Sequence, residues 1–268
     1  MLAVSLCAAN AAMAEPLRVG VSEHVYGDLA QQIGGPAISV VWLRPNPASP
    51  LPHLDLVICG CAGKDAWLRD ATRRASGPPG LIEASPPSAG GRSEPEFPWY
   101  DPPTMEKLAR RLEAELAHRI PREAPRIAAN AAQAMAAFET LDRRIGEVAR
   151  DYANSDVILA DNLYRGITER LRFKIRDEDY LQTVEAGKPP STSSLAGLKK
   201  ALQRQTGGIL LYDKDRAGPA VEELVAAAGD DGVPAVALRE RLPKGLHYQQ
   251  WMLRQVNAVH GALNEAAP

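Results

Sequence analysis

Several side chains that could do chemistry stand where a predicted strand ends. His24 follows the apolar run at 17–22, Asp161 closes the run at 156–161, and Asp213 follows the run at 208–212. The carboxyl ends of parallel strands share one edge of a sheet, where ligands of α/β proteins bind. Imidazoles and carboxylates at that edge can hold a cation, and carboxylates can also serve as acid and base.

Signatures of the common enzyme classes are missing from the sequence. It has no G-x-S-x-G elbow, no P-loop, no G-x-G-x-x-G after the first strand and no H-E-x-x-H. The five histidines, at positions 24, 53, 118, 247 and 260, are scattered, and no close pair makes a metal site by spacing. Carboxylates without a nucleophile or an oxyanion element give little support to catalysis, so we expect a protein that is not an enzyme.

The composition indicates a folded protein without a nucleic-acid footprint. The chain has 268 residues, 31 basic and 33 acidic side chains, and a formal net charge of -2. A nucleic-acid-binding domain would show a strongly basic stripe. Hydrophobic residues (45%) and charged residues (24%) are in the range of globular proteins, and the length predicts two lobes.

The N-terminus is typical of an exported protein. Residues 1–14 carry no charge, and Ala12-Met13-Ala14 fits the small-x-small rule of signal peptidase, although a basic start is missing. We therefore predict a signal peptide over 1–14 and a periplasmic mature chain; the alternative is a buried N-terminal helix. Cys59 and Cys61 alternate along one predicted strand, so we expect small residues filling a strand end rather than a bond between them.

Strands and helices alternate in the first part of the mature chain. The strand predictions cover 17–22, 38–43, 55–60 and 80–84, and helices are predicted after the first strand, at 63–74 and at 103–118. From 123 to 152 runs a longer helical pattern, with apolar residues at intervals of three and four. A helix of that length would span about 45 Å, so we interpret it as a strut between two lobes.

The alternation resumes after the long helix. Strands are predicted at 156–161, 180–185, 208–212 and 234–238, with helices at 163–172, 194–205, 218–229 and 247–265. Strands separated by helices predict parallel sheets with helices on both faces. The fold prediction is α/β, with two Rossmann-like lobes of parallel sheet joined by a long rigid helix: an N-terminal lobe over 15–122, a connecting helix over 123–152 and a C-terminal lobe over 153–268.

Four strings of the sequence resemble one family. VSEHVYGDLAQQIGG, WYDPPTMEKLA, DVILADNLYRGITERL and ERLPKGLHYQQWMLRQVNA stand in the family's order, with the long helix in its expected place. They look like the zinc/manganese substrate-binding proteins of bacterial ABC importers, cluster A-I type. The resemblance implies a periplasmic, monomeric receptor that delivers a metal ion to a membrane permease. It also implies an inter-lobe site of three histidines and one carboxylate, or a variant of these.

Transfer of the family's ligands to this chain is incomplete. The first histidine of the family lies in a P-H-x-F/W-E loop followed by a helix; Pro52-His53 is interpreted as the remnant of that loop, with the helix deleted. The second histidine falls on Phe97, which cannot bind a metal. The third ligand corresponds to Asp161 and the fourth to Glu240. After the first strand, His24 and its neighbour Glu23 are the candidates to replace a missing ligand.

Each candidate ligand also has a plain structural explanation. Asp161 can cap the following helix, Glu240 can pair with Arg239 or Arg241, and His53 can be an ordinary loop residue. Trp99 and Tyr100 are expected to pack between the lobes, and they could also stack on an organic ligand.

The leading hypothesis is capture of a divalent cation, Zn or Mn, by Asp161, Glu240, His53 and His24. Loss of imidazoles would shift the preference away from zinc toward harder ions. The alternative is a scaffold that has lost the metal site and binds an organic ligand or a partner protein.

Overall fold

The structure is a computed structural model, and it describes residues 15–45, 50–60, 65–85, 97–176, 178–185, 191–203 and 208–266. The predicted signal peptide over 1–14 lies outside the described residues. None of the described helices is both long enough and apolar enough to cross a membrane.

The first half of the chain builds a sheet of four parallel strands in the order β2-β1-β3-β4. These are β1 (Leu17–Val21), β2 (Ile38–Trp42), β3 (Leu56–Cys59) and β4 (Gly80–Glu83). Around the sheet lie α1 (His24–Gly34), η1 (Gly35–Ala37), α2 (Ala66–Arg74) and α3 (Pro102–Arg119), with η3 (Pro98–Tyr100) leading into α3. Gly35 ends α1 with a φ of 53°, a conformation that glycine adopts without steric cost.

The second half builds another sheet of four parallel strands, in the order β6-β5-β7-β8. These are β5 (Asp156–Leu159), β6 (Lys174–Arg176), β7 (Ile209–Asp213) and β8 (Ala235–Leu238). The helical elements of this half are η5 (Asn162–Tyr164), α5 (Arg165–Arg170), α6 (Glu178–Glu185), α7 (Thr192–Gln203), α8 (Pro219–Asp230) and α9 (Tyr248–Ala266). The α/β prediction with two parallel sheets is therefore confirmed.

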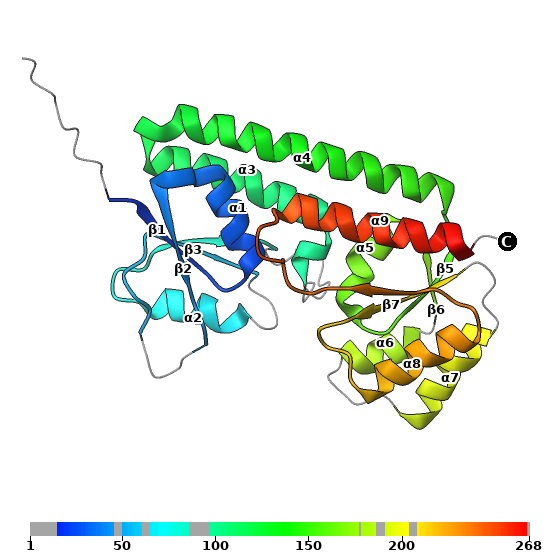
Figure 1. The fold of residues 1–268 in the computed structure, drawn as a ribbon. Coiled ribbons are helices and arrows are strands. Elements are labelled where there is room, and N and C mark those ends of the chain that lie inside the picture. Colours follow the sequence, from blue (N-terminus) through cyan, green and yellow to red (C-terminus); the bar gives the residue numbers. More distant parts are fainter. Residues whose placement is uncertain are drawn as a thin grey trace, which may run out of the picture.

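Helix α4 (Ala124–Asp151) joins the two halves after the short η4 (Pro121–Glu123). Its 28 residues rise by about 42 Å. It packs on α1 and α3 of the first half and on α9 of the second, and Figure 1 shows it running along both sheets. The long helix of the prediction is thus present, with its buried stripe at Ile127, Ala131, Phe138, Leu141 and Ile145.

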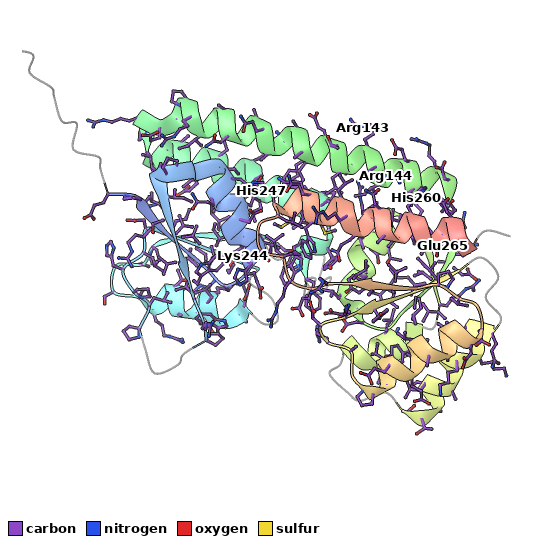
Figure 2. The ribbon with its side chains drawn as sticks, viewed as in Figure 1. Arg143, Arg144, Lys244, His247, His260 and Glu265 are labelled. Carbon is purple, nitrogen blue, oxygen red and sulfur yellow. The ribbon has the colours of Figure 1, made fainter. Side chains whose placement is uncertain are left out.

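The final helix fastens the second half to α4. Arg144 of α4 donates from Nε to Oδ1 of Asn257 over 2.7 Å, and its Nη2 lies 2.9 Å from Nδ1 of His260. Figure 2 shows Arg144 and His260 on these neighbouring helices. A single cluster of buried apolar residues includes members of both sheets, of α4 and of α9. The two halves therefore share one core.

One predicted element is wrong. Residues 180–185, expected as a strand, belong to helix α6, and the strand beside β5 is instead the three-residue β6. Tyr180 and Leu181 are both buried, at 1% and 0% exposure. Adjacent buried side chains do not distinguish the two structures, because a strand covered on both faces can be buried at every position, as β3 is.

Candidate functional site

Three loops of the second half meet where neighbouring strands end. Asp161 follows β5, Arg216 follows β7, and Glu240 follows β8. Because β7 lies between β5 and β8 in the sheet, the loop with the arginine lies between the loops with the two acids. We call Asp161 and Glu240 the carboxylate pair.

The carboxylate pair is bridged by one guanidinium nitrogen. Nη1 of Arg216 lies 3.7 Å from Oδ2 of Asp161 and 3.5 Å from Oε2 of Glu240. The two carboxylate side chains are 14% and 13% exposed, whereas the Arg216 side chain is 43% exposed. Two shielded acids from separate strands thus converge on a cation that approaches from the solvent side.

Asp161 has one of the two roles that the sequence left open, that of a helix cap. Its Oδ1 accepts a hydrogen bond of 3.0 Å from the backbone N–H of Leu163, which caps η5. Its Oδ2 is the atom that faces Arg216. Capping therefore fixes the orientation of the carboxylate and leaves one oxygen for a cation.

Further charged side chains lie near the carboxylate pair. Asp213, at the end of β7, is 3% exposed, and burial together with the neighbouring Glu240 and Asp215 raises the pKa of its carboxyl group. Arg239 donates from Nη1 to both oxygens of Asp215, over 3.1 and 3.2 Å. These loops, with Arg241 and Leu242–Pro243, line a cavity of about 410 Å³.

An aromatic side chain from the first half completes the surroundings of Arg216. Phe97 is 6% exposed, and its ring centroid lies 5.9 Å from the guanidinium carbon of Arg216. A guanidinium at this distance is attracted to the ring. Phe97 is also the position where the resemblance places a histidine. The resemblance assigns the second, third and fourth ligands of the family to Phe97, Asp161 and Glu240. All three of these residues contact Arg216.

Trp99 and Tyr100 lie between the two halves, as predicted. The hydroxyl of Tyr248 donates to the carbonyl oxygen of Trp99 over 2.6 Å. The hydroxyl of Tyr100 donates to the carbonyl oxygen of Arg239 and accepts from Nε2 of Gln255 over 3.0 Å. Burial raises the pKa values of Tyr100 and Tyr248 well above 10, so both remain neutral donors. The backbone next to Glu240 is thus held to the first half.

His24 lies at the carboxyl end of β1, the predicted edge, but in a separate cavity. Its ring packs on Trp42 with 4.4 Å between centroids. The cavity, of about 730 Å³, is lined by both halves, including Asp28, Gln31 and residues 242–246. Lys244, labelled in Figure 2, belongs to this lining segment. The structure does not place the His24 ring on the carboxylate pair.

His53 lies at the opposite edge of the first sheet. Its neighbour Asp55 bonds to the backbone of Arg18 at the start of β1, through Asp55 N to Arg18 O (2.9 Å) and Arg18 N to Asp55 Oδ2 (2.7 Å). His53 therefore stands near the amino ends of the strands, away from the edge that carries His24. The described residues between β2 and β3, 43–45 and 50–55, form no helix.

The expectation for the cysteines is wrong in one respect. Cys59 is disulfide-bonded rather than a small residue that merely fills the strand end. Its partner lies outside the described residues.

Arg216 is the site residue that sequence reasoning missed. It is separated from Asp161 and Glu240 along the chain, and no local motif marks it. Only the order of the strands, with β7 in the middle, brings it between the two acids. Within the described ranges, no group of three or more His, Cys, Asp or Glu side chains is arranged to hold a metal ion.

Comparison with known proteins gives a family match and a set of similar folds. The family model described as the periplasmic component A of the zinc-uptake complex matches residues 60–262. A sequence comparison with curated proteins finds no match.

The solved structures that resemble this one share its fold at low sequence identity. The substrate-binding protein FpvC of Pseudomonas aeruginosa, in complex with Ni²⁺, has a TM-score of 0.71 at 18% identity, with 95% of this chain and 99% of that chain covered. The periplasmic zinc-binding protein TroA of Treponema pallidum has a TM-score of 0.73 at 11% identity, with 92% and 99% covered. A ZnuA structure has a TM-score of 0.72 at 15% identity, with 94% and 100% covered.

Proposed function

Because the chain belongs to the family of the periplasmic zinc-uptake component A, we propose that it captures a divalent cation between its two lobes and delivers it to an ABC permease. Membership of this family makes the chain a substrate-binding protein of the importer type. Capture at a particular site in this chain is the proposal.

The convergence of the carboxylate pair on one cation carries the proposal. Asp161 and Glu240 come from strands separated by β7, and both are largely shielded from solvent. Two acids in this arrangement repel each other unless positive charge lies between them. The pair is therefore a place of high affinity for a cation, whether that cation belongs to the chain or comes from outside.

The donor set favours a hard or borderline ion. The described donors are carboxylate oxygens, which suit manganese, magnesium or calcium, whereas zinc prefers imidazole and thiolate. Neither His24 nor His53 is assigned to the site. Ni²⁺, Mn²⁺ and zinc are the ions of the similar proteins, and of these Mn²⁺ suits the pair best.

Export of the chain is part of the proposal. The predicted signal peptide over 1–14 and the disulfide of Cys59 are both typical of proteins that fold outside the reducing cytoplasm.

Thermal melts with isosteric variants test the proposal. A ligand that binds only the folded state raises stability by RT ln(1 + [L]/Kd), about 2.7 kcal/mol at 100 Kd. We expect Mn(II), and more weakly Zn(II), to raise the melting temperature of the wild type. Asp161→Asn and Glu240→Gln each remove one charged donor without changing the side-chain shape, and each should abolish that rise.

A matched carboxylate serves as the control. Glu223 of α8 pairs with Lys199 in the same lobe, on a side chain 58% exposed. Glu223→Gln should keep the full metal-dependent rise. If the wild type shows no rise up to millimolar ion, or if both variants of the carboxylate pair keep it, the divalent-cation proposal is wrong.

An organic cation is the second candidate, and Phe97 favours it. A guanidinium between two carboxylates and below an aromatic ring is the arrangement that the site already shows with Arg216. Free arginine, added as a third ligand in the same melts, tests this candidate. A rise with arginine and none with metal would select it.

A further inference from the structure

Building on the proposed function, we propose that Arg216 is a tethered cation that competes with the imported ion for the carboxylate pair. Without an ion, its guanidinium supplies the positive charge that the two acids require. An arriving ion has to displace it.

The order of the strands places the competitor. β7 is flanked by β5 and β8, so a side chain from the loop after β7 reaches both flanking loops. The same atom of Arg216, Nη1, faces Oδ2 of Asp161 and Oε2 of Glu240. The guanidinium thus stands between the two oxygens that an imported cation would use.

The turn after β7 holds Arg216 toward the pair. Oδ1 of the buried Asp213 accepts a hydrogen bond of 2.9 Å from the backbone N–H of Asp215. The N–H of Arg216 donates to the carbonyl oxygen of Asp213 over 3.4 Å. Asp213 is therefore a positioning residue, because its carboxylate shapes the turn that presents Arg216.

The contacts of Arg216 allow it to leave. Charge-assisted hydrogen bonds are typically about 2.7–2.9 Å long, whereas these separations are 3.5 and 3.7 Å. The Arg216 side chain is also three times as exposed as either acid, so it can swing into solvent without opening the core. Phe97, at 5.9 Å, adds an attraction that keeps the guanidinium near the pair.

The nearby arginine does not have the same role. Arg239 is engaged with Asp215 through two hydrogen bonds and, among the described residues, forms no hydrogen bond or ion pair with Asp161 or Glu240. It contributes positive charge to the same cavity without occupying the pair. This difference supplies a control.

The tether lowers the apparent affinity for an ion. Only the fraction of molecules in which the pair is open can bind, so the apparent Kd equals the intrinsic Kd divided by that fraction. If the pair is open in about one molecule in ten, removal of Arg216 tightens binding about tenfold.

Mn(II) binding to the purified full chain, measured by the loss of the free-ion EPR signal, tests this inference. Arg216→Met keeps the length of the side chain and removes its charge, and we expect its Kd to be lower than that of the wild type by about tenfold or more. Arg216→Lys keeps a positive charge on a group that is more strongly hydrated and less suited to the ring of Phe97, so its Kd should lie between those of wild type and Arg216→Met. Arg239→Met removes a charge from the same cavity and should change the Kd by less than about threefold.

The double variant Arg216→Met/Asp161→Asn locates the ion. Its Kd for Mn(II) should not show the decrease expected for Arg216→Met, because the Asp161 carboxylate that Arg216→Met frees is then absent. Retention of the gain would mean that the ion binds elsewhere, and this would overturn the inference. Far-UV circular dichroism and a melt of each variant establish that it is folded.

The two proteins answer separate questions. Equal Kd values for wild type and Arg216→Met overturn the tethered competitor and leave the proposed function standing. Binding by Arg216→Met alone supports the competitor and overturns the proposed function. If neither protein binds Mn(II), the result for wild type overturns the proposed function and the result for Arg216→Met overturns the tethered competitor.

Discussion

Asp213 shows how a single side chain both shapes and strains the candidate site. Its carboxylate is 3% exposed, and only one of its oxygens, Oδ1, has a hydrogen-bond partner among the described atoms. Burial is the main cause that raises its pKa, and the neighbouring acids Glu240 and Asp215 raise it further. The ionised form of this group is therefore costly to the folded state.

Replacement of Asp213 by asparagine should make the protein more stable at neutral pH. A carboxyl group with a raised pKa binds its proton more tightly in the folded state than in the unfolded state. The stabilisation of the folded state by this tighter proton binding is complete below the ordinary pKa of 3.8. It is lost as the pH rises through the raised pKa of the folded state. Asparagine still accepts from the N–H of Asp215 and carries no charge, so we expect a gain of about 1 kcal/mol at pH 7.

Denaturant melts between pH 4 and pH 8 measure this effect. The difference between Asp213→Asn and wild type should grow as the pH rises. The exposed Asp231, just beyond α8, is the control, and Asp231→Asn should give a small difference that does not grow. A gap of constant size for Asp213→Asn would show that burial of its charge is not the cause.

At the scale of residues, the sequence predicted some positions of the candidate site and missed others for identifiable reasons. Asp161 and Glu240 follow strands whose apolar runs are easy to recognise, so their edge of the sheet could be predicted. Arg216 depends on strand order, which local patterns do not encode. His53 was assigned to the cleft through the family resemblance, although it precedes β3 and the start of a parallel strand lies at the edge opposite the strand ends.

At the scale of elements, helix α9 obtains its N-terminal cap from the other half of the chain. Asp28 of α1 accepts through Oδ2 from the backbone N–H of Tyr248 over 2.8 Å, and its Oδ1 lies 2.8 Å from Nδ1 of His247. Nε2 of Gln32 donates to the same carboxylate over 2.7 Å. Helix N-termini have unsatisfied N–H groups and favour negative charge, so Asp28 stabilises both α9 and the contact between halves.

Asp28→Ala should lower the free energy of unfolding by about 1–2 kcal/mol, the usual cost of losing a cap. Asp28→Asn keeps an acceptor and should lose less. Urea denaturation measures both values, with Asp70→Ala as the control because Asp70 is exposed on α2. If Asp28→Ala and Asp70→Ala cost the same, the cap contributes nothing to stability.

Most elements could be predicted because their patterns are long or strongly apolar. The 28-residue α4 has a regular buried stripe, and β3 is buried at every position. Residues 180–185 misled the prediction because a short run with Val and Thr fits a strand by composition. The strand that pairs with β5 is β6 (Lys174–Arg176). Its three residues are too few for a strand pattern to be recognised in the sequence.

At the scale of the whole molecule, the two sheets are separate but their cores are not. One cluster of buried apolar residues extends from β1 and β3 through α3, α4 and α9 to β5 and β7. Bonds from Tyr248 to Trp99 and from Tyr100 to Arg239 join the halves beside the site. Shared burial of this kind predicts a rigid receptor, in which loops and side chains such as Arg216 move more readily than the lobes.

The shared core also predicts that the chain unfolds in one transition. Ile58 of β3 and Leu210 of β7 are both 0% exposed and belong to the same cluster. Truncation of such a residue to alanine costs about 2–5 kcal/mol, and each kcal/mol lowers the melting temperature by about 2–4 °C at this size. In differential scanning calorimetry, Ile58→Ala and Leu210→Ala should each shift a single peak whose calorimetric and van't Hoff enthalpies agree. If the lobes fold independently, each variant will shift one of two peaks and leave the other in place. That result would contradict the shared core, and it would mean that the predicted lobes, 15–122 and 153–268, are independently folding domains.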